Sequence, residues 1–266
     1  NSRGLTITAS GVTTISGAVG ASEQLGALTT DSSGTLLLNS GTVAATTQIY
    51  NDVTTLGANT TLTGTTVRFE NTLDSDSGMT RTLTINASGT TTFGETVGDT
   101  DKLATLTTDI GGSVEFTGAA ITVGTTSSIN DTTELFTITG HGLTVGDVVV
   151  FSGSGLPAGV SSGTDYYVIT APDANTFTVS AVPGGATLDV TAAGGVGSAT
   201  TGARVATTGA QTYGDPVIVA ATSPGLNMIG TNFTFDQTVN ADTAASNRDL
   251  VLNSTGAVLF SGEVGN

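Results

Sequence analysis

Short segments in which apolar residues alternate with threonine run along almost the whole chain. Residues 83–85, Leu-Thr-Ile, are one example, and residues 34–38 and 113–116 are further β-prone segments bounded by Gly, Asn, Asp or Ser. Such segments, about four to eight residues long and rich in β-branched side chains, are typical of strands. Signals for helices are nearly absent from the chain. The pattern therefore predicts an all-β protein.

The same apolar pattern returns over a long distance. The segment 5–11, LTITASG, recurs at 83–89 as LTINASG, and a third version, LVLNSTG, occupies 250–256. A basic residue stands two positions before the first leucine of each version, namely Arg3, Arg81 and Arg248. The shift from Leu5 to Leu83 also aligns later positions, which gives a long repeat of fixed period. A fixed period of this length indicates stacked repeating units.

A finer period divides the long repeat. Apolar strand starts follow one another at nearly even intervals, at Leu5, Leu25, Val43, Leu62, Leu83, Leu103 and Ile121. Four of these intervals lead from Leu5 to Leu83, so we interpret the long repeat as four short coils. A coil of about 20 residues fits one rung of a parallel β-helix, whose stacked rungs form a continuous core. The alternative is a string of β-sandwich domains, in which strands usually recur every ~8–12 residues.

The regular spacing is interrupted after Ile121 and resumes near Val205. Residues 209–213 match residues 46–50. The distance between these two segments is longer than one long repeat, so an additional segment must lie between them. This segment has longer apolar runs, at 134–138, 147–151, 165–169 and 175–179. Insertions into repeats emerge as loops or small domains on one face, and we expect an antiparallel barrel or sandwich here. The predicted domains are β-helix repeats at 1–121, an inserted domain at 122–205, and resumed repeats at 206–266.

The composition narrows the possible partners. The net charge is −16, from 22 acidic and six basic residues without a basic stripe, so neither nucleic-acid binding nor attraction to anionic lipid is expected. No cysteine is present, which excludes disulfides and thiolate metal sites. No apolar run approaches the ~18 residues of a membrane helix, so we expect no membrane insertion. The chain begins and ends within the repeat, which predicts a segment or processed form of a longer polypeptide.

A few residues suggest chemistry. Asp74 with Asp76, and Asp99 with Asp101, alternate in turns and could offer the oxygen ligands that Ca²⁺ prefers, so these four are candidate metal ligands. No other cofactor is expected. His141 is the single histidine and lies between two glycines. Without a second histidine or a cysteine it is expected to serve as a turn residue.

Aromatic and acidic residues at matching repeat positions favour architecture over catalysis. Glu70 and Asp236 occupy equivalent positions, whereas a catalytic carboxylate pair is expected to interrupt a repeat, so no enzyme is expected. Adjacent residues of a strand point to opposite faces, so either Tyr166 or Tyr167 faces outward as a candidate contact for a glycan or partner. Inward-facing rings are expected to stack in the core, at Phe69, Phe93, Phe116, Phe235 and Phe260.

Two resemblances follow from these motifs. Residues 83–98, 103–112 and 207–217 resemble the repeats of large bacterial exoproteins, the filamentous-haemagglutinin-like adhesins, over roughly two-thirds of the chain. This resemblance implies a right-handed β-helical shaft at the bacterial cell surface or outside the cell, used in attachment, matrix or biofilm. The insert, at 136–143, 156–159 and 165–169, is similar to a small β-domain of phage tail and bacterial surface proteins. Neither resemblance implies catalytic residues.

These observations predict a non-enzymatic structural or adhesive segment of a large surface repeat protein. Its expected partners are neighbouring repeats of the same chain or identical chains, together with a glycan or cell-surface receptor. A phage tail or fibre component is the alternative function. A polysaccharide-active β-helix enzyme is a third.

Overall fold

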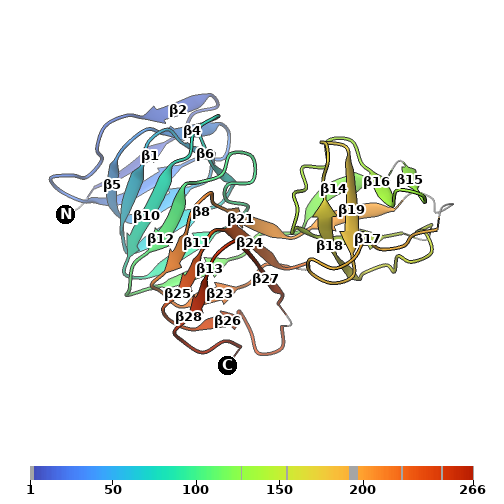
Figure 1. Ribbon diagram of the computed structural model, residues 1–266. Coiled ribbons are helices and arrows are strands. Elements are labelled where there is room, and N and C mark those ends of the chain that lie inside the picture. Colours follow the sequence, from blue (N-terminus) through green and yellow to red (C-terminus); the bar gives the residue numbers. More distant parts are fainter. Residues whose placement is uncertain are drawn as a thin grey trace.

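The computed structural model describes residues 3–126, 128–153, 155–191, 197–222, 224–246 and 248–265. Every regular element in these ranges is a β-strand, and none of the described residues forms a helix that could cross a membrane. Figure 1 shows two parts, a stacked array of parallel strands and an insert of antiparallel strands standing at its side. The predicted all-β class, the stacked parallel rungs and the antiparallel insert are confirmed.

The parallel strands of the array stack on three faces, which we number in the order in which the chain visits them. The first face contains β1 (Gly4–Ile7), β3 (Leu25–Thr30), the end of β5 (Thr42–Tyr50), β8 (Thr66–Phe69), β11 (Thr90–Phe93), β13 (Ser113–Phe116), β23 (Val217–Val219) and β26 (Val239–Ala241). The second face contains β2 (Val12–Ile15), β4 (Thr35–Leu38), β6 (Val53–Leu56), β9 (Leu73–Ser75), β21 (Ala203–Ala206), β24 (Leu226–Gly230) and β27 (Leu250–Ser254). The third face contains the start of β5, β7 (Thr60–Gly64), β10 (Thr82–Ala87), β12 (Thr105–Thr108), β22 (Gln211–Tyr213), β25 (Phe233–Phe235) and β28 (Val258–Phe260).

Two features join these ladders into one body. Strand β5 continues around a corner, pairing with β7 at its start and with β8 at its end, so the first and third faces form one 14-stranded sheet. On the second face, Val97 bridges Leu73 to Val205 and so links the strands that precede the insert to those that follow it. The array is therefore continuous across the insertion.

Alternating side chains fill the interior of the array. In β10, Leu83, Ile85 and Ala87 are fully buried, while the threonine and asparagine residues between them are half-buried. One apolar cluster extends through the stacked rungs from Ile15 to Val239. Since each rung buries its inward side chains only against its neighbours, stability comes from stacking.

Two aromatic ladders run through this core. On the first face the rings of Tyr50, Phe69, Phe93 and Phe116 stack with centroid distances of 4.9, 5.7 and 5.3 Å. On the third face the rings of Tyr213, Phe235 and Phe260 stack at 5.2 and 4.8 Å. The predicted core stacks are confirmed. Phe260 lies on the outermost described strand of its face and is therefore 38% exposed.

The long repeat does not correspond to four turns of the coil, and that interpretation is wrong. Leu5 pairs with Leu28 instead of Leu25, and Leu83 pairs with Leu106 instead of Leu103. From Leu5 in β1, the chain makes three full turns to reach β8 on the same first face. It then passes through β9 on the second face and reaches Leu83 in β10 on the third. The third version, β27, lies on the second face. The motif thus occurs once on each face, since each face offers the same inward-pointing strand positions.

The long repeat also aligns Asp31 with Asp109 and Gly34 with Gly112, and contacts between adjacent rungs explain why. The Asp31 carboxylate accepts the backbone N–H of Ala9 at 3.1 Å, and its repeat equivalent Asp109 accepts that of Ala87 at 2.9 Å. Each carboxylate therefore satisfies a backbone donor of an adjacent rung. At Gly112 a Cβ atom would lie 1.8 Å from a carbonyl oxygen of that rung, so the close approach requires glycine.

The insert has its own sheet and its own core. Its strands are β14 (Ile121–Thr125), β15 (Ser128–Asn130), β16 (Leu135–Thr137), β17 (Val148–Ser152), β18 (Asp165–Thr170), β19 (Thr176–Ser180) and β20 (Ser198–Thr201). They pair antiparallel in one seven-stranded sheet around a core that includes Phe136, Phe151 and Phe177. Entry and exit lie side by side, because Ile121 pairs with Thr201. Residues 203–205, which the sequence places in the insert, belong to β21 and pair in parallel within the array.

The recurrent arginines clamp the loops before their strands. Arg81 donates two hydrogen bonds to Asp76, at 2.6 and 2.7 Å, and Arg248 donates two to Asp242, both at 2.9 Å. A planar guanidinium suits such a two-point contact with a carboxylate. The basic residue that the repeat retains therefore has a structural role at these two positions.

This clamp makes a measurable difference to the ionisation of Asp242. Hydrogen bonds from Arg248 lower the pKa of Asp242 to about 2. Because the pKa is depressed in the folded chain, the clamp contributes stability above the ordinary aspartate pKa of ~3.9 and loses it as the pH falls through about 2. We expect an NMR titration of the Asp242 carboxyl carbon to have its midpoint near this low value. In Arg248→Met the midpoint should return to the ordinary range, and an unchanged midpoint would contradict the clamp.

Candidate functional site

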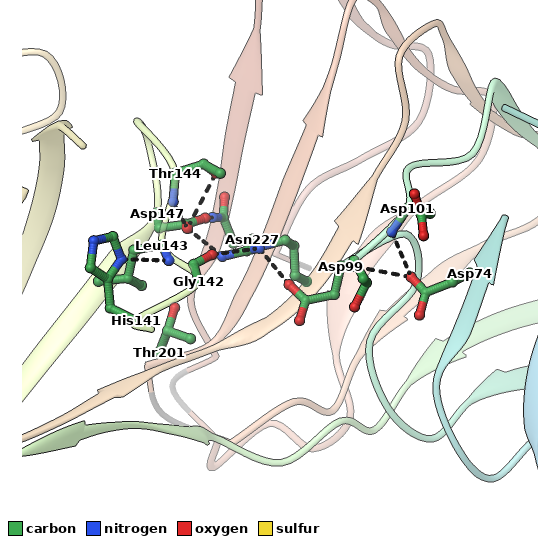
Figure 2. A network of polar contacts seen from close by, with 12 residues as sticks. Asp74, Asp99, Asp101, His141, Gly142, Leu143, Thr144, Asp147, Thr201 and Asn227 are labelled. Atoms are coloured by element: carbon green, nitrogen blue, oxygen red, sulfur yellow. Dashed lines mark hydrogen bonds and ion pairs between the residues drawn. The ribbon is translucent and has the colours of Figure 1, made fainter. Parts of the chain in front are cut away.

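A buried polar network fastens the insert to the array (Figure 2). Arg204 on β21 is 4% exposed and donates hydrogen bonds to the carboxylates of Asp147 in the insert and Asp99 in the array. Asp147 is fully buried and also accepts the backbone N–H of Thr144 at 2.6 Å and the amide of Asn227 at 2.7 Å. The buried carboxylate thus has a cation and hydrogen-bond donors, which is the condition under which a charge is tolerated inside a protein.

A second contact extends the network by one rung. The amide nitrogen of Asn253 donates to the carbonyl oxygen of Gly146 at 2.6 Å and to the side-chain oxygen of Asn227 at 2.8 Å. Gly146 has a φ of +95°, and a Cβ there would lie 2.6 Å from the Asn253 side chain. Consecutive strands β21, β24 and β27 therefore hold one loop of the insert through Arg204, Asn227 and Asn253.

The sequence analysis missed this network. Its members are far apart along the chain: Arg204 lies 57 positions after Asp147, and Asn227 lies 80 positions after it. The one available signal was Arg204 itself, the only arginine or lysine between Lys102 and Arg248. A lone cation beside an acidic insert could have suggested a buried ion pair.

Beside the network a cleft of about 860 Å³ lies between the insert and the array. The insert contributes residues 167–170 of β18 and the loops at 145–146 and 183–185. The array contributes Lys102 and three segments at consecutive rungs, residues 207–208, 229–231 and 252–255. Small-molecule sites usually occupy ~300–1,000 Å³, often at the boundary between two structural units. The cleft is therefore the candidate functional site.

The structure separates the two candidate tyrosines. Tyr166 is 3% exposed, and its hydroxyl accepts the backbone N–H of Ser161 at 2.8 Å within the insert core. Tyr166 is therefore the inward-facing member of the pair. Tyr167 points to the opposite face, is half-buried and lines the cleft. Burial, with the nearby charges of Asp165 and Asp249, raises the pKa of Tyr167, so its phenol stays protonated at neutral pH.

Three of the four candidate calcium ligands lie near one another. Asp74 accepts the backbone N–H groups of Thr100 and Asp101 at 3.1 and 3.4 Å (Figure 2). Burial raises the pKa of Asp74, the charges of Asp99 and Asp101 add to this, and the two hydrogen bonds oppose it. These carboxylates therefore share one region of the array, beside the junction with the insert.

Two of the four already have cationic partners. Asp76 is paired with Arg81, and Asp99 is paired with Arg204. Among the residues that the structure describes, no group of three or more His, Cys, Asp or Glu side chains is arranged to hold a metal ion. Ca²⁺ binding at Asp74, Asp76, Asp99 and Asp101 stays a prediction from the sequence.

The remaining candidates for chemistry have structural surroundings. His141 accepts the backbone N–H of Leu143 at 2.9 Å through Nδ1, and its Nε2 lies 3.2 Å from a backbone carbonyl oxygen. Nδ1 is thus engaged within the predicted turn, whereas the partner of Nε2 is Thr176 at the start of β19. Glu70 is paired with Arg68 and follows β8 on the first face, while Asp236 follows β25 on the third face. These two carboxylates therefore do not share a face.

Comparison with known proteins yields no relative: no family model, no curated protein and no solved structure matches the chain. The β-helical shape that the adhesin resemblance implies is present, but no matching relative supports that family or the similarity of the insert. The function must therefore be argued from the site and the array.

Proposed function

We propose that this chain is a non-enzymatic structural and adhesive segment of a filament outside the cell or at the bacterial cell surface. The array serves as the shaft, and the insert is a side module held at a fixed position. The observation that carries the proposal is the continuous stack of parallel rungs around one shared core. Such a stack forms an extended rod with a long outer surface, which suits a shaft. The resemblance of the repeats to those of surface adhesins supports the location.

The edges of the stack support continuation of the shaft. In the described part of the chain, no strand pairs with the outer edge of β28, where Leu259 and Phe260 are exposed. At the opposite end β2 pairs with β4 alone among the described strands, and Val12 is 71% exposed. A parallel edge of this kind can accept a further rung from the same polypeptide or from an identical chain. Open head-to-tail pairing would extend the shaft in one direction.

Electron microscopy of native material and of the purified chain tests this function. We expect rods that carry lateral protrusions at regular spacing, because each insert is fastened to its own segment of shaft. A charged substitution at the edge, Leu259→Lys, should shorten rods formed by the purified chain. The matched control, Ile110→Lys, alters another exposed apolar side chain, in the loop between β12 and β13, and should leave them unchanged. Globular monomers alone would contradict the proposal, and closed trimers or rings would favour a phage tail component.

A further inference from the structure

We propose that the cleft between the insert and the array binds a neutral oligosaccharide, one of whose sugar rings packs against Tyr167. This inference goes beyond the shaft function, because it assigns a ligand class to one surface of the molecule. Three observations carry it: an aromatic ring on a paired strand of the cleft wall, hydroxyl groups that can act as acceptors, and an acidic surrounding.

The strand that carries the aromatic ring is paired on both sides before any ligand arrives. Tyr167 lies in the middle of β18, where it pairs with Val148 of β17 on one side and Ser180 of β19 on the other. It is the one aromatic side chain among the residues that line the cleft. An aromatic ring offers a flat apolar surface beside a polar hydroxyl, which suits the C–H face and hydroxyl edge of a sugar. Because the backbone that carries the ring belongs to a paired strand, little backbone freedom is lost on binding.

The opposite wall offers hydrogen-bond acceptors. The exposed hydroxyl of Thr208 donates its proton to a backbone carbonyl oxygen at 3.4 Å. The hydroxyl of Ser254 donates to another carbonyl oxygen at 2.8 Å and accepts one backbone N–H, that of Gly256, at 3.2 Å. A hydroxyl whose proton is already donated retains lone pairs that can accept a further hydrogen bond. The wall therefore suits a ligand with several O–H donors. Lys102 adds one cationic donor at the same cleft.

The charge of the surroundings selects a neutral ligand. The chain carries a net charge of −16, and the charges of Asp165 and Asp249 act on Tyr167 itself. An anionic polysaccharide would meet a negative potential that one lysine does not offset. A neutral sugar meets no such repulsion.

The polar network keeps the two walls at a fixed separation. Gly146 and Asn253 both line the cleft and are joined by the 2.6 Å hydrogen bond described above. The insert wall and the array wall are thus tied together at the edge of the cleft. A ligand can bind without the insert having to close on it.

A printed panel of neutral oligosaccharides, three to six hexose or N-acetylhexosamine units long, tests the proposal together with sialylated and uronic-acid oligosaccharides. We expect binding to at least one neutral probe and weaker binding to the anionic ones. Calorimetry with the tightest neutral probe should then show about tenfold weaker binding by Tyr167→Ala, the loss expected for a stacked ring. Tyr167→Phe, which keeps the ring, should stay within about threefold of the parent chain. Ile110→Ala, an exposed apolar truncation on the array outside the cleft, should bind like the parent.

Several results would overturn the assignment. These are no binding to any neutral probe, a preference for the anionic probes, unchanged affinity in Tyr167→Ala, or binding of a peptide panel in place of sugars. Should Tyr167→Ala fail to fold, Tyr167→Leu keeps an apolar side chain on the strand, removes the ring and is expected to show the same loss. Rod formation is recorded for each variant, so failure of the sugar site is distinguishable from failure of the shaft.

Discussion

Replacing Phe93 by alanine is expected to lower the free energy of unfolding by about 3–5 kcal/mol, the cost of removing a buried phenylalanine. Phe93 is 1% exposed and lies between Phe69 and Phe116, with interplanar angles of 2° and 12°. Its removal leaves a cavity in a core that each rung shares with its neighbours, and breaks the ladder on both sides. The chain has no tryptophan, so urea unfolding is best followed by circular dichroism.

Phe260 is the matched control for this experiment. Its ring stacks on Phe235 at 4.8 Å, but it lies on the outermost described strand of its face and is partly exposed. Phe260→Ala should therefore cost only about 1–2 kcal/mol, since less apolar surface is returned to water. Equal losses for the two variants would show that stacking across successive rungs does not hold the array together.

The second large effect is expected at the junction. Arg204→Met leaves the Asp147 carboxylate buried without its cation, and breaking a buried ion pair from one side costs about 3–5 kcal/mol. The loss should fall on the attachment of the insert. Hydrogen exchange is therefore expected to accelerate in the loop 142–147 and along β21, while the inner rungs of β8 and β11 keep their protection. Small-angle scattering should show a wider range of insert positions.

Two further variants make this result interpretable. Arg68→Met removes an arginine from the exposed pair with Glu70 and should change stability by about 0–1 kcal/mol. Combining Arg204→Met with Asp147→Asn removes both buried charges and retains an oxygen that can accept the N–H of Thr144. This double variant should recover part of the loss. If Arg204→Met behaves like Arg68→Met, the network does not fasten the insert.

Much of the fold follows from the sequence because its cause is local or periodic. Alternation in a segment such as residues 83–85 already determines which side chains face inward. The loss of spacing after Ile121 identifies the insert, because longer apolar runs require a different packing unit. The recurring phenylalanines predict stacked rings, since equivalent positions of stacked rungs lie above one another.

The register of the rungs was decided only by the tertiary structure. The number of residues from one rung to the next varies, and it is smaller between Thr35 and Val53 than between Phe233 and Val258. Turn lengths set these offsets, and no apolar period records them. Because the three faces are similar, the same motif can recur on a different face each time. From the sequence alone, such a recurrence looks like a whole number of turns.

Apart from the choice of an outward tyrosine, the candidate site was also decided by the tertiary structure. Its network joins Asp99, Asp147, Arg204 and Asn227, whose positions along the chain share no spacing. The sequence limited the outward tyrosine to Tyr166 or Tyr167, and packing of the insert chose Tyr167. Local patterns determine which side of a strand a residue occupies, because that depends on its immediate neighbours. The cleft depends on where two separately folded surfaces meet, and that is set by contacts between residues distant in the sequence.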